Sequence, residues 1–402
     1  MFPKNNLLSR GGRTIALAGL LAGALALTAC SGAEQKGGDA GPGNIPGSSV
    51  KVSIEPNGDN VNPAVPVKVH ATGGTLTEVA VSNTAKEKKV AGELSPDRTT
   101  WTSTEPLGYA STYAVLAHAT DGSGKTAEQQ GKISTLAPKQ QAQPNLIPAP
   151  SAVASSGVGV GQPIVFSFNQ PVQDKAAVEK QLSVVSQPAQ EGGWYWIDDK
   201  NVHYRPKEYW QAGTTLTVSA KVYGLDFGNG VYGASDRTET YKVHDSWVAK
   251  ADGGTEQMQI FHNGQNVKTM DISMGKDATP THLGPHVISD KHENYTMDSC
   301  TYGVCKGQPG YYRSNERWSQ RISNDGEFVH ENPASVGQQG STNVSHGCIN
   351  LNGENAKWFY QNLGLGDVVE VTNSGGPQLP LWDLYGDWSL SWDKWQAGSA
   401  LK

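Results

Sequence analysis

The feature that most constrains this chain is a period-two alternation of apolar and polar residues. It recurs in four stretches, whose apolar members are Val65, Val67, Val69 and Ala71; Tyr113, Val115, Ala117 and Ala119; Ile164, Phe166 and Phe168; and Leu216, Val218, Ala220 and Val222. Successive side chains of a strand point to opposite faces, so this pattern predicts half-buried strands. Turn signals such as Pro56-Asn57-Gly58 and Asp121-Gly122 separate the stretches. Strands at this spacing predict β-sandwiches in a mainly β chain.

Composition divides the chain into units. With 402 residues it is long enough for two to three domains. The proline-rich, polar stretch APKQQAQPNLIPAP predicts a linker at residues 137–149, between β-domains at residues 49–136 and 150–246. A third, strand-rich domain is expected at residues 247–375, followed by an extension at residues 376–402.

The third domain carries one helix pattern. Asn352 is a favourable N-cap, and four residues follow it at helical spacing: Ala356, Phe359, Tyr360 and Leu363. A strand is expected after this helix, at residues 368–371.

The extension is rich in tryptophan, with four of the eleven in the chain: Trp382, Trp388, Trp392 and Trp395. The last three lie at i, i+4 and i+7, on one face of a helix. This spacing favours a terminal helix packed onto the preceding domain. The alternative is an exposed surface on which glycan rings stack.

The N-terminus has the features of an export signal. Lys4, Arg10 and Arg13 precede an apolar run of about 13 residues, which is short for a membrane span and typical of a signal peptide. The run ends in Leu-Thr-Ala-Cys30, which resembles a bacterial lipobox, where the signal is cut before a cysteine that is then lipidated. An ordinary signal peptide with an incidental cysteine is the alternative.

A lipoprotein signal peptide at residues 1–29 would place the mature chain outside the cytoplasm, on the cell membrane and facing the wall. Residues 30–48 are rich in Gly, Ser and Pro and predict a flexible tether from a lipid anchor on Cys30. Cleavage would remove three basic residues and no acidic one, which moves the formal charge from −6 to −9. The chain has no basic stripe or run, so no nucleic-acid partner is expected.

Three cysteines remain once Cys30 is set aside. Cys300 and Cys305 lie five residues apart and could close a small loop in an oxidising compartment, although two free thiols are the alternative. If they pair, Cys348 is left over, and an unpaired thiol in an exported protein is either buried and inert or kept for reactivity. Its neighbours in STNVSHGCIN are polar, and histidine is the usual activator of a thiol. The sequence therefore favours a reactive Cys348.

One motif points to a known family. His330, followed after fourteen residues by Ser345-His346-Gly347-Cys348-Ile349-Asn350, resembles the signature of the L,D-transpeptidases, which have a YkuD-type catalytic domain. Four more stretches are similar to the mycobacterial type of this family: residues 273–276, 279–281, 297–299 and 310–313. The resemblance implies two immunoglobulin-like β-sandwich domains before a β-rich YkuD-type catalytic domain that has one helix and a tryptophan-rich C-terminal extension.

The resemblance implies a reaction as well. The family forms 3→3 cross-links between peptidoglycan stem peptides and requires no cofactor for catalysis. A cysteine thiolate attacks the carbonyl of the third residue of a tetrapeptide stem, and D-alanine leaves. The side-chain amine of meso-diaminopimelate on a second stem then attacks the thioester. β-Lactams of the carbapenem class acylate the same cysteine and act as inhibitors.

Residue roles follow from the same resemblance. Cys348 is the expected nucleophile and His330 the general base, which the main-chain carbonyl of Glu331 orients; some relatives have serine at that position. His346 is expected either to order the loop or to contact substrate. Gly347 lets the loop approach substrate closely, and N–H groups around it are expected oxyanion donors. The remaining substrate-contact candidates are Tyr312, Asp325, Gly326, Asn350, Ser345 and Met297, the last as pocket wall or core.

A weaker motif concerns metal. Asp226, Asn229 and Gly230 place oxygen ligands in a glycine-rich turn, as a structural calcium loop would, whereas a plain β-turn is the alternative. No cluster of His, Cys and Glu in the sequence has zinc spacing.

Other functions stay open at this point. An L,D-carboxypeptidase would use water in place of the acceptor amine, and an enzyme that joins a protein to the wall would use a different acceptor. A wall-binding lipoprotein with an inactive catalytic domain is a third alternative. The presence of both Cys348 and His330 argues against an inactive domain.

Overall fold

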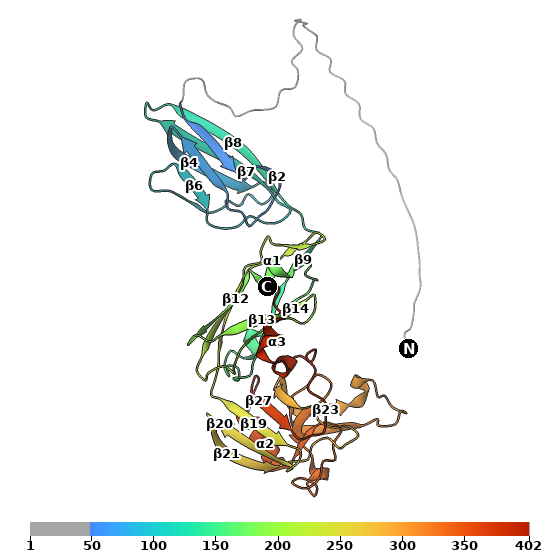
Figure 1. The fold of residues 1–402 in the computed structure, drawn as a ribbon. Helices are drawn as coiled ribbons and strands as arrows, with labels where there is room; N and C mark the ends of the chain where they lie inside the picture. The colour runs from blue at the N-terminus through green and yellow to red at the C-terminus, as the bar shows by residue number, and fades with distance from the viewer. Residues whose placement is uncertain (1–48, 402) are drawn as a thin grey trace, which may run out of the picture. The chain divides into compact units, whose positions relative to one another are not determined.

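The computed structural model describes residues 49–401, so the signal peptide, Cys30 and the tether lie outside the described residues. Strands dominate the described part of the chain (Figure 1), which confirms the predicted mainly β fold class. Within residues 49–401, no helix is both long enough and apolar enough to cross a membrane.

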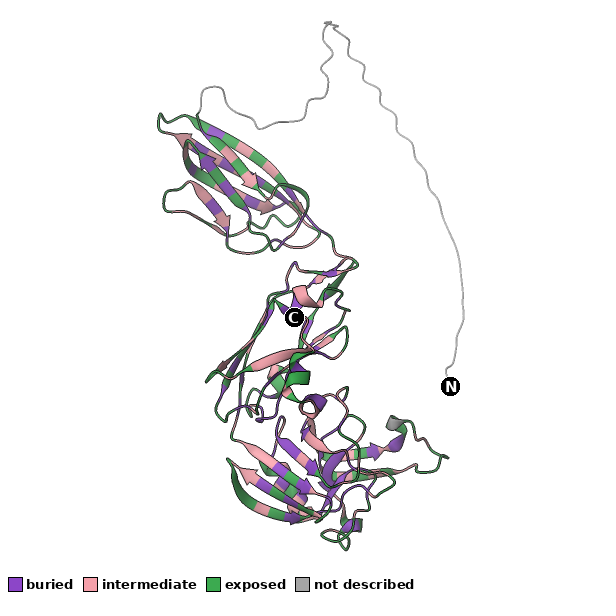
Figure 2. Ribbon diagram, viewed as in Figure 1, coloured by how far each residue is buried: buried purple, intermediate pink, exposed green. Residues whose placement is uncertain are grey.

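The first strand-rich region consists of two four-stranded sheets, in the orders β1-β3-β6-β5 and β2-β8-β7-β4. Its strands are β1 (Lys51–Glu55), β2 (Gly58–Val61), β3 (Lys68–Thr72), β4 (Gly74–Asn83), β5 (Gly92–Leu94), β6 (Thr100–Ser103), β7 (Thr112–Asp121) and β8 (Thr126–Thr135). Buried residues alternate with more exposed ones along β3 and β7 (Figure 2), as the period-two pattern predicts. Val65 departs from it, because it precedes β3 and is exposed.

The second region has two larger sheets, in the orders β10-β11-β14-β13 and β12-β15-β18, and a small one, β16-β17-β9. Its strands are β9 (Gln140–Ala142), β10 (Pro144–Ile147), β11 (Ile164–Phe168), β12 (Leu182–Gln187), β13 (Gly192–Trp196), β14 (Asn201–Pro206), β15 (Thr215–Ala220), β16 (Asp226–Gly228), β17 (Val231–Gly233) and β18 (Arg237–Lys242). It also contains η1 (Pro150–Ala152) and α1 (Lys175–Glu179).

The segment predicted as a linker, residues 137–149, is more ordered than its composition indicates. β9 pairs in parallel with β17, and β10 pairs antiparallel with β11. Both prolines in the neighbourhood of β10 lie at its ends, Pro144 as its first residue and Pro148 just after it. These are positions where the missing N–H of proline interrupts a ladder least, so the segment adds strands to the second region.

The third region is built on two sheets, β21-β20-β19-β27-β22 and β23-β24-β25-β26. Its strands are β19 (Trp247–Asp252), β20 (Gln257–His262), β21 (Gln265–Asp271), β22 (Gly284–Val287), β23 (Asp290–Asp298), β24 (Arg313–Arg321), β25 (Phe328–Glu331), β26 (Ile349–Leu351) and β27 (Val368–Thr372). Two short helical turns, η2 (Ser299–Tyr302) and η3 (Pro333–Ser335), lie between them. The apolar faces share one core, which includes Ile260, Val329 and Ile349.

The predicted helix is present as α2 (Gly353–Asn362), directly after β26. Asn352 is its N-cap, since its side chain accepts a hydrogen bond from the N–H of Asn355. Ala356 and Phe359 are buried in the core of the third region. The helix thereby anchors the end of the strand that follows Cys348.

The tryptophan-rich extension does not form the single helix that its spacing predicts. Trp388 lies in η4 (Gly386–Ser389), whereas Trp392 and Trp395 lie in α3 (Trp392–Gln396), which Ser391 precedes as the N-cap residue. An extended residue, Leu390, separates the two turns. The i, i+4, i+7 spacing is therefore real, but it runs across a break in the helix.

The extension packs onto the second region through Arg205 of β14. This buried guanidinium lies 4.7 Å from the ring centres of Trp388 and Trp395 and 5.4 Å from that of Trp392. The Trp395 indole also donates to the carbonyl of Gly193 at 2.9 Å. These three tryptophan rings are therefore packed against the preceding domain, as the first interpretation predicts. Trp382 alone of the four is exposed, at 69%.

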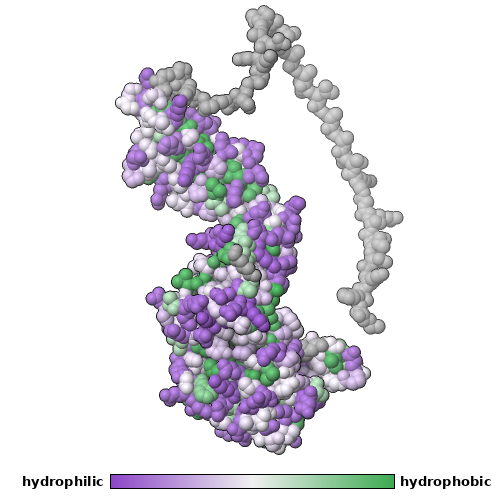
Figure 3. Space-filling view, viewed as in Figure 1, coloured by the Kyte–Doolittle hydropathy of each residue, from purple (hydrophilic) through white to green (hydrophobic). Residues whose placement is uncertain are grey.

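The surface is mainly hydrophilic in the view of Figure 3, with hydrophobic side chains in small scattered groups. The large apolar side chains that are exposed within residues 49–401 are Val65, Val185, Val267, Val336, Val344, Trp382 and Leu401.

Candidate active site

Cys348 and His330 are brought together by two short parallel strands. β25 carries His330, and β26 begins one residue after Cys348. In the register of this pair, His330 lies opposite Asn350. Seventeen residues of sequence, 331–347, thus separate two side chains that the sheet brings together.

The loop before Cys348 is held by hydrogen bonds from Ser345. Its hydroxyl donates to the carbonyl of Cys348 at 2.6 Å and accepts from the N–H of Gly347 at 3.0 Å. Gly347 has a φ of 125°, a backbone conformation that side-chain-bearing residues rarely adopt. Ser345 is therefore a structural residue of the loop, and Gly347 is required for its shape.

His330 is almost completely buried, and its two nitrogens have different environments. Nδ1 lies 2.8 Å from the main-chain carbonyl of Glu331 and 3.4 Å from the Glu316 carboxylate. Nδ1 therefore carries a proton, and Nε2 is the nitrogen left for the hydrogen bond with Cys348. Burial lowers the pKa of His330, but the hydrogen bonds and charges of Cys348 and Glu316 outweigh it and raise that pKa to about 10.

Glu316 is a residue of this site that the sequence reading missed. Burial raises the pKa of its carboxyl group, but hydrogen bonds from His330 and Ser314 outweigh this effect and leave the pKa below its usual value. The sequence contains a signal for Glu316, because Tyr312, Ser314 and Glu316 occupy alternate positions and so point to one face of a strand. All three line the same cavity.

The cavity at Cys348 has a volume of about 270 Å³. Its lining includes Met297, Tyr312, Ser314, Glu316, His330, Asn332, Val344, Ser345, His346, Cys348 and Asn350. Met297 is buried against Phe328 and Cys348, so it serves as wall and core at once. Asn350 is 1% exposed, and both polar atoms of its side chain lack a hydrogen-bond partner within residues 49–401. A buried carboxamide without partners is available to a peptide ligand.

His346 lies at the rim of this cavity and is exposed. Its ring stacks on Tyr312 with centres 5.4 Å apart, and Nε2 lies 3.3 Å from the Lys276 ammonium. Burial of the ring and then the charge of Lys276 lower the pKa of His346. The two histidines therefore differ in charge as well as in position.

Of the predicted pair Asp325 and Gly326, only the glycine contacts Cys348. The Cys348 thiol donates to the Gly326 carbonyl, with Sγ and O 3.6 Å apart. The Asp325 side chain turns away toward Ser323 and His282 and does not line the cavity.

The other predicted sites also have defined places in the structure. Cys300 and Cys305 are joined by a disulfide, in the segment that connects β23 to β24. Asp226 accepts a hydrogen bond from the N–H of Gly228, and the Lys139 side chain packs against Gly230. The hairpin turn between β16 and β17 is thus present, and calcium binding there remains a prediction.

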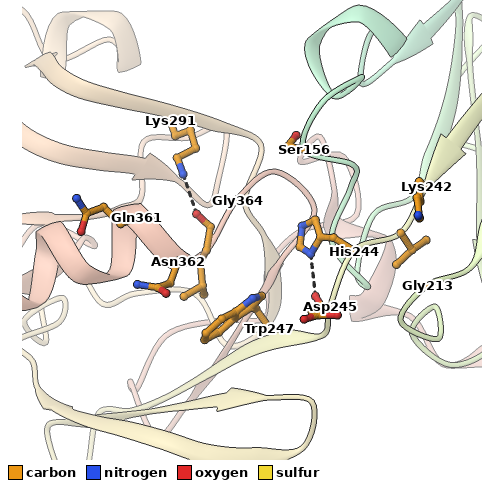
Figure 4. Close-up of a pocket in the computed structure, with 12 residues that line it drawn as sticks. Ser156, Gly213, Lys242, His244, Asp245, Trp247, Lys291, Gln361, Asn362 and Gly364 are labelled. Atoms are coloured by element: carbon orange, nitrogen blue, oxygen red, sulfur yellow. Dashed lines mark hydrogen bonds between the residues drawn. The ribbon is translucent and has the colours of Figure 1, made fainter.

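A larger cavity of about 610 Å³ (Figure 4) shares no lining residue with the cavity at Cys348, among the residues that the structure describes. It is lined by Ser156, Gly213, Lys242, Val243, His244, Asp245, Trp247, Lys291, Gln361, Asn362, Leu363 and Gly364. Lys291 donates to the carbonyl of Leu363 at 2.8 Å, and His244 Nδ1 lies 2.7 Å from the carbonyl of Asp245. Within residues 49–401, its lining contains no cysteine beside a histidine, unlike the lining of the cavity at Cys348.

Comparison with known proteins agrees with this geometry. Residues 247–371 match the L,D-transpeptidase catalytic domain (YkuD) family model, and residues 58–226 match the bacterial Ig domain model. The chain is 40% identical over 335 residues to L,D-transpeptidase 2 of Mycobacterium tuberculosis strain CDC 1551 / Oshkosh, which covers 83% of this chain and 81% of that relative. The chain belongs to the L,D-transpeptidase family. This confirms the resemblance that the motif around Cys348 carries.

Other members of the family show the same likeness. L,D-transpeptidase 5 of M. tuberculosis strain H37Rv is 38% identical over 403 residues, covering 97% of this chain and 85% of that relative. Among solved structures, LD transpeptidase LdtMt1 in complex with imipenem is 30% identical, covers 57% of this chain and 99% of its own, and has a TM-score of 0.49. The chain is thus an L,D-transpeptidase, a cysteine-dependent acyltransferase, and its Ig-like part precedes its catalytic domain.

Proposed function

We propose that this L,D-transpeptidase forms 3→3 cross-links between peptidoglycan stem peptides, through a thioester on Cys348. The observation that carries the proposal is the cavity in which a buried Cys348–His330 pair lies beside the unpartnered carboxamide of Asn350. A thiolate needs a cationic partner to persist at neutral pH, and a peptide backbone needs a polar group to hold it. A cationic partner, His330, and a polar group, the Asn350 carboxamide, are both present within one small cavity.

In the first step, the Cys348 thiolate attacks the carbonyl carbon of the third residue of a tetrapeptide stem. The C–S bond forms, the C–N bond to D-alanine breaks, and His330 gives its Nε2 proton to the leaving amine. The Gly347 N–H is already donated to Ser345, so the N–H groups of His346 and Cys348 with the Tyr312 hydroxyl are the oxyanion donors that we propose.

In the second step, the side-chain amine of meso-diaminopimelate on another stem attacks the thioester. The new amide bond forms, the C–S bond breaks, and His330 accepts the proton that the amine loses. Atoms and charge balance without ATP, because one amide is exchanged for another. The site requires no cofactor for these steps.

The experiment that tests the function uses the purified protein with tetrapeptide-containing muropeptides. We expect tandem mass spectrometry to find a dimer joined between the third residues of both stems, with one D-alanine released per cross-link. A product that is only shortened by D-alanine would instead identify an L,D-carboxypeptidase. Attachment of a protein amine would identify a wall-attachment enzyme, and no turnover an inactive wall-binding protein.

Inhibition by carbapenems follows from the same chemistry. The thiolate that attacks a stem carbonyl would also attack the strained carbonyl of the β-lactam ring, and ring opening leaves no diffusible leaving group. We expect one carbapenem per chain, attached to Cys348. Intact-protein mass spectrometry with a Cys348→Ala control checks this expectation.

We also propose that Cys30 carries a lipid that holds the protein on the outer face of the cell membrane. The proposal rests on the lipobox-like Leu-Thr-Ala-Cys30 and the Gly/Ser/Pro-rich residues after it. We expect Cys30→Ala to release the protein from the membrane fraction. A native protein that is already soluble, or that begins at another residue, would refute lipidation.

A further inference from the structure

A second group of polar side chains converges on either side of Gly326, the residue whose carbonyl contacts Cys348, and the acyl-transfer steps do not use it. The group consists of His282, Asp325 and Glu327, and more than forty residues of sequence separate the histidine from the carboxylates. His282 Nδ1 lies 3.0 Å from Glu327 Oε1 and 3.6 Å from Asp325 Oδ2. One ligand-type atom from each residue lies within 4.8 Å of the other two.

We propose that His282, Asp325 and Glu327 form a binding site for a divalent cation, Zn²⁺. One imidazole nitrogen and two carboxylate oxygens are ligands that zinc accepts, and three protein ligands leave a fourth position for water. Atoms bound about 2.1 Å from one tetrahedral ion lie roughly 3–3.5 Å apart. The two distances from His282 Nδ1, 3.0 and 3.6 Å, lie near that separation, and all three ligand atoms lie within 4.8 Å of one another, so a bound ion would draw them closer together.

Groups outside the set orient its ligands. Glu327 Oε1 accepts from the main-chain N–H of His282 at 2.8 Å, and its Oε2 lies 3.1 Å from Nε2 of the fully buried His286. His286 Nδ1 in turn lies 3.0 Å from the carbonyl of Gly284. The Ser323 hydroxyl donates to Asp325. Metal ligands are commonly fixed in this way by a surrounding layer of hydrogen bonds.

Charge and access agree with a cation. A third acidic residue, the buried Asp383, is close enough for the charges of Asp325 and Glu327 to act on it. The neighbourhood thus gathers three carboxyl groups around the imidazoles of His282 and His286. The side chains of Asp325 and His282 are 33% and 19% exposed, so an ion can enter from solvent.

The site adjoins the nucleophile through the backbone. Gly326, between two of the ligands, supplies the carbonyl that accepts from the Cys348 thiol, 3.6 Å from Sγ. On the other side, a Cβ added to Gly347 would lie 3.4 Å from Glu327 Cγ. A bound ion would therefore fix the turn against which the catalytic loop packs.

The test is calorimetric titration of the purified full chain with Zn²⁺, in the Cys348→Ala background. That background removes the thiol, which would bind zinc itself, and the other cysteines of the third region are joined in a disulfide. We expect one Zn²⁺ per chain. Adding Asp325→Asn, at an exposed position, should weaken binding at least about tenfold, and adding His286→Asn about 10- to 100-fold. Asp245→Asn, which changes an exposed carboxylate paired with the half-buried His262, is the matched control and should leave the affinity unchanged.

Cobalt provides a second readout. Co²⁺ in place of Zn²⁺ should give the visible absorption of a four-coordinate site, and His282→Gln should abolish it. The proposal is overturned if the Cys348→Ala chain takes up no stoichiometric zinc. It is equally overturned if folded Asp325→Asn and His282→Gln variants, checked by their thermal unfolding, bind zinc as tightly as their parent.

Discussion

At the scale of single residues, the proposed role of Cys348 as a nucleophile depends on the charge of His330. The Glu331 carbonyl sets the orientation of the imidazole, and the Glu316 carboxylate adds a negative charge beside Nδ1. The pKa of His330 is about 10 in the folded protein, above its ordinary value near 6.5. The resulting stabilisation is fully present below the ordinary value and is lost as the pH rises through about 10. At neutral pH His330 is therefore retained as the imidazolium.

We expect Glu316→Gln to slow carbapenem acylation at neutral pH by about tenfold or more, because each unit of lowered His330 pKa removes about 1.4 kcal/mol of preference for the imidazolium. The rate should be measured by intact mass across a pH series, together with the ultraviolet absorbance of the thiolate. Glu293→Gln, an exposed change on neighbouring β23, is the control. An unchanged pH profile in Glu316→Gln would show that this carboxylate has only a packing role.

The two histidines of the motif should differ in mutational effect. His330→Ala removes the buried imidazole that we propose as the base, and should lower the acylation rate by about 10²–10⁴-fold. His346→Ala removes an exposed ring that contacts Tyr312 and Lys276, and should cost less than about tenfold. Acylation rates of the two variants, measured from single-turnover mass spectra, show which histidine matters more. The opposite order of effects would assign the base to His346.

At the scale of elements, the extension holds its place through buried indole rings. Trp395 is fully buried, and Trp395→Ala should destabilise the fold by about 3–5 kcal/mol, as large aromatic deletions from cores do. Trp382→Ala, in the same segment but exposed, should stay within about 0.5 kcal/mol. Denaturant unfolding of both variants measures the two changes in the free energy of unfolding. Equal stabilities would mean that the extension is not packed as described.

Elements whose pattern is local could be predicted from the sequence. The Asn352 cap and the apolar spacing after it specify α2, and period-two runs specify strands such as β7 and β11. The extension shows the limit of such reasoning. Its tryptophans keep helical spacing across an extended Leu390, because contacts with Arg205 on another domain decide where each ring packs. Tertiary contacts of this kind leave no pattern in the local sequence from which they could be predicted.

The same distinction between local pattern and tertiary contact applies to the residues of the site. Cys348 and His330 could be found from a motif of fixed spacing, and Glu316 from its period of two after Tyr312. His282 and Glu327 could not be joined from spacing, because the turns after β24 and before β22 bring them together only in the folded chain.

At the scale of the whole molecule, the first strand-rich region contributes no residue to the cavity at Cys348, as far as residues 49–401 show. We expect a chain without residues 31–136 to keep most of its turnover of soluble muropeptides. The same deletion should impair function in cells, where the region would carry the catalytic domain away from the membrane. Loss of turnover in a folded truncated protein would instead make that region part of the active site.

The central claim is that Cys348 carries the stem peptide as a thioester before a cross-link forms. The most direct measurement is the intact mass of the protein, quenched in acid during turnover of a tetrapeptide stem. We expect an added mass equal to the donor stem without its D-alanine, localised to Cys348, which decays as the 3→3 dimer appears and is absent from Cys348→Ala. A Cys348→Ala protein that still forms the dimer, or turnover without any adduct on Cys348, would contradict this account.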